Sequence, residues 1–177
     1  MDIILYPDPR LRARNQPITS FDAALAETAE EMFELMYKNQ GVGLAAPQVG
    51  ANIRLMVFNP GEKEGETGEE IVLCNPKIVA KSKDKEHGDE GCLSFPGVSG
   101  SIARHLFVRV TAQNLQGEKI DLEFRDWEAR VFQHEFDHLD GLVFVERMTA
   151  VDKTVAKPIL EELRADWADA QTASQEG

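Results

Sequence analysis

Hydrophobic residues recur at helical spacing in two parts of the chain. In the first part the pattern predicts an N-terminal helix that starts at Ser20 and ends before Gly41. In the second part the helical period runs from Asp126 to Leu139, and Gly141 follows where glycine commonly ends a helix. The apolar positions of the first helix are Phe21, Leu25, Ala29, Met32, Phe33 and Met36.

Between the two helices the pattern is that of strands. Residues 52–59 contain an uninterrupted apolar run, which predicts a largely buried strand. A second strand is expected at 71–75, and residues 77–81 are expected to extend the sheet. Residues 107–113 and 119–124 alternate apolar and polar positions around N-L-Q-G, which indicates a β-hairpin.

The segments outside these elements have weaker patterns. Pro7 and Pro9 predict an extended arm over residues 1–11, because proline lacks a backbone donor and disfavours helix in the residue before it. Residues 60–70 are rich in glycine and glutamate, and residues 81–89 are charged, so both segments are expected to be loops.

The C-terminal part is expected to contain a short strand, a third helix over 150–170 and a disordered T-A-S-Q-E-G tail. This order predicts an α+β fold with mostly antiparallel sheets packed around a central helix, together with an N-terminal and a C-terminal helix. No internal repeat is present, and 177 residues suit one domain. We expect a single domain over 1–177, with about 166–177 forming the end of the last helix and a flexible tail.

Composition narrows the classes of function. The net charge is −12, and such a surface repels phosphate backbones and anionic lipids, so no direct nucleic-acid or membrane binding is expected. No run of 18 apolar residues occurs, and the N-terminus lacks the pattern of a signal peptide. We expect a cytoplasmic protein, or a mature organellar form whose leader has been removed. Cys74 and Cys92 allow one disulfide in principle, but nothing else suggests a secreted scaffold.

The segment Q-H-E-F-D-H-L carries the strongest chemical signal. In a helix, His134 and His138 lie one turn apart on one face and can share a metal ion, although H-E-x-x-H also arises by chance on solvated helix faces. Trp127 and Val131 continue the same stripe, so the histidines are expected to point inward, where a metal would satisfy both. Glu135 lies about 100° round the helix, close enough to reach water at such a metal without ligating it.

The segment D-E-G-C-L-S-F-P-G contains a candidate third ligand. A free cysteine is commonly a small buried hydrophobic residue, and this is the interpretation for Cys74. Cys92 differs because Gly91 before it allows close backbone approach. A thiolate together with two imidazoles would leave the fourth position of a tetrahedral metal open for water.

The segment G-V-G-L-A-A-P-Q-V-G has two glycines in the spacing G-x-G. It lacks the third glycine, the lysine and the helix start of nucleotide-binding loops, which argues against a nucleotide site. Gln48 is an amide among apolar neighbours. Two interpretations stay open for it: a hydrogen-bonded structural residue, and a donor that polarises a substrate carbonyl.

Taken together, G-V-G-L-A-A-P-Q, E-G-C-L-S and Q-H-E-F-D-H-L resemble the three signature motifs of the peptide deformylase family, and the resemblance extends over roughly residues 3–148. It is greatest to the compact bacterial and plastid-type members. It implies that Cys92, His134 and His138 bind one divalent metal ion. It also implies co-translational removal of the formyl group from N-formylmethionine on nascent chains. Fe²⁺ is the expected physiological ion, and Zn²⁺, Ni²⁺ or Co²⁺ are also compatible with Cys/His₂ ligation.

The resemblance also suggests a mechanism. Glu135 takes a proton from the attacking water and delivers it to the departing amine. The oxyanion is held by the metal, by the Gln48 amide and, by family analogy, by the Leu93 backbone N–H. The residues expected to bind the substrate, as backbone partners or as walls of the methionine pocket, are Val42, Gly43, Gly91, Trp127 and Val131.

The residues Ser99, Gly100 and Ser101 depart from the family pattern, because many members carry an arginine or a bulky residue there. Contacts to the later residues of the substrate are therefore left open. The expected partners are formylmethionyl peptides and nascent chains, together with the ribosome near its exit tunnel. We expect a monomer or a weak dimer.

Two other classes of protein share parts of this pattern. A metalloprotease with H-E-x-x-H takes a third ligand downstream, and the candidates here are Glu146, Glu161 and Glu162, without a recognisable ligand motif. A metal-stabilised binding module would fill all four positions with protein ligands, and only Cys74, His87 or His105 could complete the set. Neither histidine has a promising sequence setting, and the protease interpretation leaves Cys92 unexplained.

Overall fold

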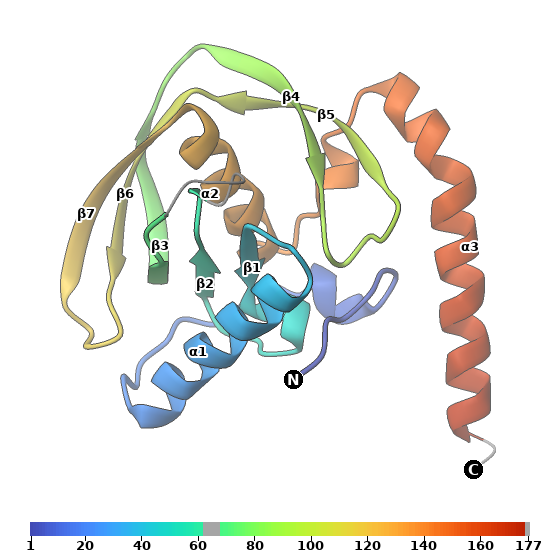
Figure 1. Ribbon diagram of the computed structural model, residues 1–177, viewed down its shortest axis with the longest axis horizontal. Coiled ribbons are helices and arrows are strands. Elements are labelled where there is room, and N and C mark those ends of the chain that lie inside the picture. Colours follow the sequence, from blue (N-terminus) through green and yellow to red (C-terminus); the bar gives the residue numbers. More distant parts are fainter. Residues whose placement is uncertain (62–67, 176–177) are drawn as a thin grey trace.

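The computed structural model describes residues 1–61 and 68–175, so part of the expected loop at 60–70 lies outside the described residues. The fold is α+β, as predicted. A five-stranded antiparallel sheet in the order β1-β2-β3-β6-β7 and a two-stranded sheet of β4 and β5 enclose helix α2 (Figure 1). The strands of the larger sheet are β1 (Gly43–Ala45), β2 (Leu55–Phe58), β3 (Ile71–Lys81), β6 (Phe107–Gln113) and β7 (Lys119–Arg125).

The smaller sheet consists of β4 (Lys85–Gly91) and β5 (Ser99–His105). The helices are α1 (Ala23–Lys38), α2 (Asp126–Leu139) and α3 (Ala150–Gln175), and short 3-10 turns occur at Pro9–Arg12, Ala46–Val49 and Phe144–Glu146. In the described ranges no helix has an apolar stretch long enough to cross a membrane.

Strand β2 explains how the two helices are held on opposite faces of the larger sheet. Its side chains alternate between faces, and all of them are buried. Met56 and Phe58 belong to the cluster that contains the apolar side of α2, whereas Leu55 and Val57 belong to the cluster that contains α1. A strand buried on both faces reads as a continuous apolar run, which is why it could be recognised from the sequence.

Helix α2 is anchored in the larger core by aromatic packing. Phe132 is fully buried and stacks on Phe124 with ring centroids 5.4 Å apart. The predicted bounds of this helix are confirmed, and Gly141 follows its C-cap Asp140 with φ +74°. The left-handed backbone favours glycine, and a Cβ at this position would lie 2.5 Å from the carbonyl oxygen of Arg12.

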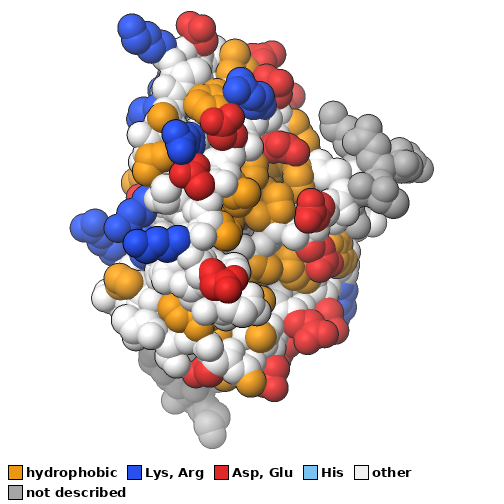
Figure 2. All heavy atoms as spheres, turned by 90° about the vertical axis from the view of Figure 1, so that its left-hand side faces the viewer, with side chains coloured by type: hydrophobic (Ala, Val, Ile, Leu, Met, Phe, Trp, Pro, Cys, Tyr) orange, Lys and Arg blue, Asp and Glu red, His pale blue; other side chains and the backbone are white. Residues whose placement is uncertain are grey.

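A second core lies between α3 and the N-terminal segment. Ile159, Leu160 and Leu163 pack against a buried cluster that includes Tyr6 and Phe95, whose rings stack 4.8 Å apart. Helix α3 then continues along one side of the molecule (Figure 1). The face shown in Figure 2 carries acidic side chains around a hydrophobic hollow, while lysines and arginines gather mainly along its left and upper edges.

The first helix starts later than the apolar pattern predicts. It begins at Ala23 rather than at Ser20, because the Asp22 carboxylate accepts a hydrogen bond from the Leu25 N–H at 3.1 Å and caps the helix. The Ser20 hydroxyl donates to this carboxylate at 3.0 Å. Ser20 therefore supports the cap and lies outside the helix.

The prediction of a loop at 81–89 is wrong, because β4 occupies Lys85–Gly91 and pairs with β5 along its whole length. Neither strand shows the usual alternation of apolar and polar residues. The buried positions include Glu90 on β4, and Gly100 and Arg104 on β5. Charged and small residues thus occupy sites where a hydrophobic pattern would have indicated a sheet.

Three smaller predictions also need correction. The expected extended arm contains a 3-10 turn at Pro9–Arg12, since proline is tolerated in a first helical turn and Asp8 accepts from the Arg10 N–H. The expected short strand after α2 is a 3-10 turn at Phe144–Glu146. Helix α3 continues to Gln175, so the start of the expected disordered tail is helical, and residues 176–177 lie outside the described residues.

The predicted strands at 71–75 and 77–81 form one strand, β3, whose register against β6 shifts at two points. The hairpin of β6 and β7 is confirmed, with the register Phe107↔Arg125 to Gln113↔Lys119.

Replacing Phe132 by alanine is expected to lower the free energy of unfolding by about 3–5 kcal/mol, because it removes a fully buried ring and leaves a cavity. Denaturant unfolding of the metal-free protein measures this change. The control Val155→Ala, at a position 69% exposed on α3, is expected to change stability by less than about 0.5 kcal/mol. Equal losses in the two variants would contradict this assignment of the core.

Candidate metal centre

Three potential metal ligands meet where the end of β4 faces α2. Cys92 directly follows β4, and His134 and His138 lie one turn apart on α2. Their ligand atoms all lie within 4.8 Å of one another. The Cys92 Sγ is 3.3 Å from the His138 Nε2, close to the separation of about 3.5 Å expected for a thiolate and an imidazole on one tetrahedral ion.

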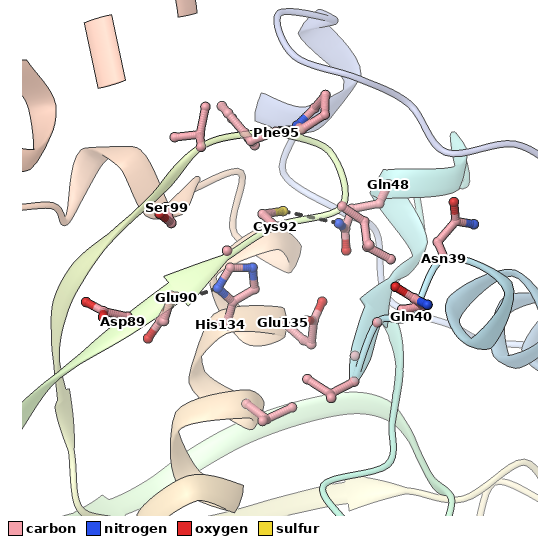
Figure 3. Close-up of a pocket in the computed structure, with 18 of the residues that line it drawn as sticks. Asn39, Gln40, Gln48, Asp89, Glu90, Cys92, Phe95, Ser99, His134 and Glu135 are labelled. Atoms are coloured by element: carbon pink, nitrogen blue, oxygen red, sulfur yellow. Dashed lines mark hydrogen bonds and ion pairs between the residues drawn. The ribbon is translucent and has the colours of Figure 1, made fainter. Parts of the chain in front are cut away.

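The hydrogen bonds of the histidines fit a metal site. His134 donates from Nδ1 to Glu90 Oε2 at 2.9 Å, which fixes the ring and leaves its Nε2 for a metal (Figure 3). His138 is 1% exposed, and burial, followed by the charge of His134, holds its pKa well below the ordinary value. A divalent metal requires neutral imidazoles. Burial also opposes the charged form of His134, but hydrogen bonds with Cys92 and Glu90 outweigh burial and raise its pKa well above the ordinary value, so a metal would displace a proton from this ring.

Glu90 is the centre of a buried ionic network. Its carboxylate receives Arg104 Nε at 2.8 Å and Arg104 Nη2 at 2.9 Å, and Arg130 Nη1 at 2.9 Å. Burial opposes its ionisation, but the hydrogen bonds from Arg104 and His134 outweigh burial and lower its pKa to about 2. Arg104 also donates from Nη1 to Asp137 at 2.6 Å, so the network joins β4, β5 and α2.

Glu135 faces the same space from the next position on α2 (Figure 3). It is 4% exposed, and burial raises its pKa to about 7. Its Oε2 accepts no hydrogen bond from the described residues. A Cβ at Gly43 would lie 2.6 Å from Glu135 Oε1, so the glycine on β1 provides the room for this carboxylate.

The Gln48 side chain is held in one orientation. Its Oε1 accepts from the Ala45 N–H at 2.9 Å, which turns the Nε2 toward the site (Figure 3). The Nε2 lies 3.4 Å from Cys92 Sγ and 3.2 Å from Ser94 Oγ. The amide therefore makes a structural hydrogen bond and also presents a donor beside the sulfur, so both sequence interpretations of Gln48 are compatible with the geometry.

The cluster opens into a cavity of about 700 Å³, a size typical of ligand pockets. Each residue expected to bind substrate lines it: Val42, Gly43, Gly91, Trp127 and Val131, together with Leu93. Val131 is 3% exposed, whereas Trp127 is 37% exposed and donates from Nε1 to the Pro60 carbonyl at 3.0 Å. The helix face that carries His134, His138 and Val131 therefore points inward as expected, whereas Trp127, on the same face, lies at the rim of the cavity.

The candidates for other ligand sets do not join the cluster. Among the described residues, Cys92, His134 and His138 form the one group of such side chains that is close enough to share an ion. Glu146 pairs with Arg12, and His105 Nδ1 lies 2.6 Å from the Ser82 carbonyl. Both cysteines are free. Cys74 is fully buried in the α1 core, as predicted, and burial raises the pKa of its thiol to about 11.

Comparison with known proteins identifies the family. The sequence profile of the family described as polypeptide deformylase matches residues 1–154. The chain belongs to this family. It is 46% identical to peptide deformylase 1B, chloroplastic, of Oryza sativa, over 99% of this chain and 62% of the relative. It is 41% identical to peptide deformylase of Thermotoga neapolitana, over 90% of this chain and 93% of the relative.

The fold of this deformylase family member matches a solved structure of the family. The crystal structure of Arabidopsis thaliana peptide deformylase 1B in complex with an inhibitor superposes with a TM-score of 0.90 at 45% identity, over 96% of this chain and 93% of that chain. The chain spans between 53% and 62% of the length of the three plant relatives. The family is metal-dependent, and Cys92, His134 and His138 form a group that could hold the metal.

Sequence reasoning missed the residues that orient the candidate ligands, among them Glu90 and Arg130. Glu90 stands within the quoted D-E-G-C segment, but a carboxylate next to a glycine gives no sign of its partners. Arg130 precedes His134 by four positions on the same helix face, a spacing that could have suggested contact with a shared neighbour.

Replacing Cys92 by alanine is expected to abolish stoichiometric binding of one divalent metal, because two imidazoles alone hold it weakly. Metal analysis after dialysis measures the occupancy. Cys74→Ala is the matched control, since it removes the other free thiol from the α1 core and is expected to keep one metal per chain. Full occupancy in Cys92→Ala would show that another residue is the third ligand.

Proposed function

We propose that this chain removes the N-terminal formyl group from formylmethionine of nascent polypeptides by hydrolysis, releasing formate and a free amine. The observation that supports this most is the cluster of Cys92, His134 and His138 with the buried Glu135 carboxylate beside it, at the end of a peptide-sized cavity. Membership of the polypeptide deformylase family supports the same reaction.

A divalent metal held by Cys92, His134 and His138 would supply a Lewis acid that makes hydroxide available near neutral pH and polarises the formyl oxygen. The thiolate and two imidazoles accept Fe²⁺, Zn²⁺, Ni²⁺ and Co²⁺ alike. We propose Fe²⁺ as the physiological ion, on the resemblance of the three motifs to the family.

Glu135 carries the proton. Its carboxylate accepts a proton from the attacking water and returns it to the amine nitrogen as the C–N bond of the formamide breaks. Two features suit it to this role. One oxygen accepts no hydrogen bond from the described residues, and Gly43 leaves the space in which the carboxylate sits.

Two donors of the chain stabilise the oxyanion that develops on the formyl carbonyl. The Gln48 Nε2 is one, because its orientation is fixed by the bond from Ala45 to the amide oxygen. The Leu93 backbone N–H is the other, since it follows the ligand Cys92 directly and lines the cavity. Donors that are fixed before the reaction need no reorganisation as charge develops.

The peptide binds as an extended strand along the cavity. Strand β1 is the outermost strand of its sheet, so its open edge beside Val42 and Gly43 can receive a further strand. A Cβ at Gly91 would meet only the Val98 carbonyl at 3.8 Å, which leaves room for the other side of the peptide. Val131 and Trp127 form walls of the pocket for the methionine side chain.

Nascent chains are the proposed partners in the cell, with the ribosome near its exit tunnel as the place of encounter and a monomer or weak dimer as the working form. The plant relatives are named as chloroplastic, or as chloroplastic and mitochondrial. We propose the cytoplasm for a bacterial-type enzyme, or an organelle for a mature form.

Formate release from a formyl-methionyl peptide, by protein loaded with Fe²⁺ without oxygen, tests the activity. We expect turnover of the formyl peptide, little hydrolysis of the N-acetyl analogue and no cleavage within a long folded substrate. Internal cleavage would favour a protease, and metal binding without any turnover would favour a metal-stabilised binding module.

Glu135→Gln is expected to retain one metal and to lose nearly all turnover, because an amide cannot accept the proton. Formate release and metal content are measured on the same sample. Glu128→Gln, on the exposed side of the same helix, makes the same chemical change and is expected to keep full activity. Substantial turnover in Glu135→Gln would remove Glu135 from the proton path.

Gln48→Ala is expected to lower kcat by about 10²-fold or more, since it removes a donor to the oxyanion. Steady-state kinetics and denaturant unfolding are measured together. Gln116→Ala, in the exposed β6–β7 turn, serves as the control. A loss of stability with unchanged kcat would assign Gln48 a structural role alone.

A further inference from the structure

Arg130 lies one helical turn before His134, on the face of α2 that meets the smaller sheet. Its side chain is only 11% exposed. A buried guanidinium is stable only where acceptors surround it, and the acceptors here come from both strands of that sheet.

The contacts of Arg130 join α2 to β4 and β5. Its Nη1 donates to the Ile102 carbonyl of β5 at 2.8 Å and lies 3.3 Å from the Gly88 carbonyl of β4. Its Nη2 donates to the Glu86 carbonyl at 2.7 Å. Three backbone carbonyls of a two-stranded sheet are thus bound by one side chain of the helix that carries the histidines.

The fourth acceptor connects Arg130 to a metal ligand. Arg130 Nη1 donates to Glu90 Oε1 at 2.9 Å, while the other oxygen, Oε2, accepts from His134 Nδ1 at 2.9 Å. One carboxylate therefore bridges two residues that are four positions apart on the same helix (Figure 3 shows the His134 half of the bridge). Arg104 occupies the remaining positions on both oxygens.

The sheet that Arg130 binds also delivers the third ligand. Cys92 follows the last residue of β4, and in the described residues β4 pairs only with β5. The position of β4 on α2 therefore sets the distance from the sulfur to both imidazoles. Gly88 lets the Arg130 guanidinium pack closely against β4, because a Cβ at this position would lie 2.8 Å from the Arg130 Cζ.

We propose that Arg130 is a positioning residue of the metal centre: it ties β4 and β5 to α2 and holds the Glu90 carboxylate against His134. The inference rests on the proposed metal site, but it does not depend on the proposed reaction. Arg104 donates to the same carboxylate but to none of the three backbone carbonyls that Arg130 binds. Of the two arginines, only Arg130 therefore ties the backbone of β4 and β5 to α2.

The experiment compares Arg130→Met and Arg130→Lys with the parent protein and with Arg109→Met. Arg109 makes a two-bond ion pair with Asp121 on the exposed β6–β7 hairpin, so its replacement removes the same charge away from the site. The dissociation constants of Zn²⁺ and Co²⁺ are measured by competition with a chelator, and the visible spectrum of the Co²⁺ form is recorded.

We expect Arg130→Met to weaken metal binding by about tenfold or more and to change the Co²⁺ spectrum. The substitution removes a hydrogen bond that holds the Glu90 carboxylate against His134, and it loosens the attachment of β4, which positions Cys92. Arg130→Lys, which keeps the charge but offers one donor group, is expected to lie between Arg130→Met and the parent. Arg109→Met is expected to match the parent. Unchanged affinity and spectrum in Arg130→Met, whatever its thermal stability, would overturn the proposal.

Gly88→Ala provides a second route if Arg130→Met does not fold. The added methyl group displaces the guanidinium while all five of its donors remain, and we expect weaker metal binding in the same assay. Parent-like affinity in a folded Gly88→Ala protein would count against the proposal. Since no substrate is used, a failure to find deformylation would leave the result standing, whereas full metal occupancy in Cys92→Ala would show that the third ligand is a residue other than the one β4 delivers.

Discussion

The structure depends on the buried contact between Glu90 of β4 and Arg104 of β5, continued to Asp137 of α2. These groups are 4–8% exposed in their side chains, and an isolated charge at that depth would be strongly destabilising. Each charge is matched by an opposite one with short hydrogen bonds, so the network is stable only when the small sheet and the helix are in their native places. The three candidate ligands meet at that same junction.

Helix α2 thus has two faces held by different forces. One face carries Phe132 into an aromatic core, where buried contact area is the stabilising factor and the attraction has no preferred direction. The other face carries His134 and Asp137 into hydrogen bonds of defined length and direction. Apolar packing fixes the helix in the fold, and directional bonds fix its rotation about its own axis.

The sequence was most informative where chemistry and periodicity coincide. Helix α2 was recognised with its bounds because apolar residues and histidines follow one period, and β2 because both of its faces are buried among apolar side chains. The smaller sheet was missed because three of its four buried positions hold Glu90, Gly100 and Arg104, and Ile102 alone gives no hydrophobic alternation.

The partners of the buried charges could not be predicted from the sequence, for another reason. Arg130 and Glu90 are 40 positions apart, and a pairing over that distance is a property of the folded chain. Likewise, the need for glycine at position 43 appears only when the Glu135 carboxylate is seen against it. The resemblance to the family supplied the ligand set, whereas the side chains that orient those ligands came from the structure.

Two of the three candidate ligands, the proposed proton carrier Glu135, and Arg130, which binds β4, all project from a single helix of 14 residues. The position and rotation of α2 relative to the two sheets therefore determine the geometry of the whole candidate site. A slide or twist of α2 would carry both imidazoles and Glu135 together and leave the sulfur behind, so the centre would lose its geometry as a unit rather than one residue at a time.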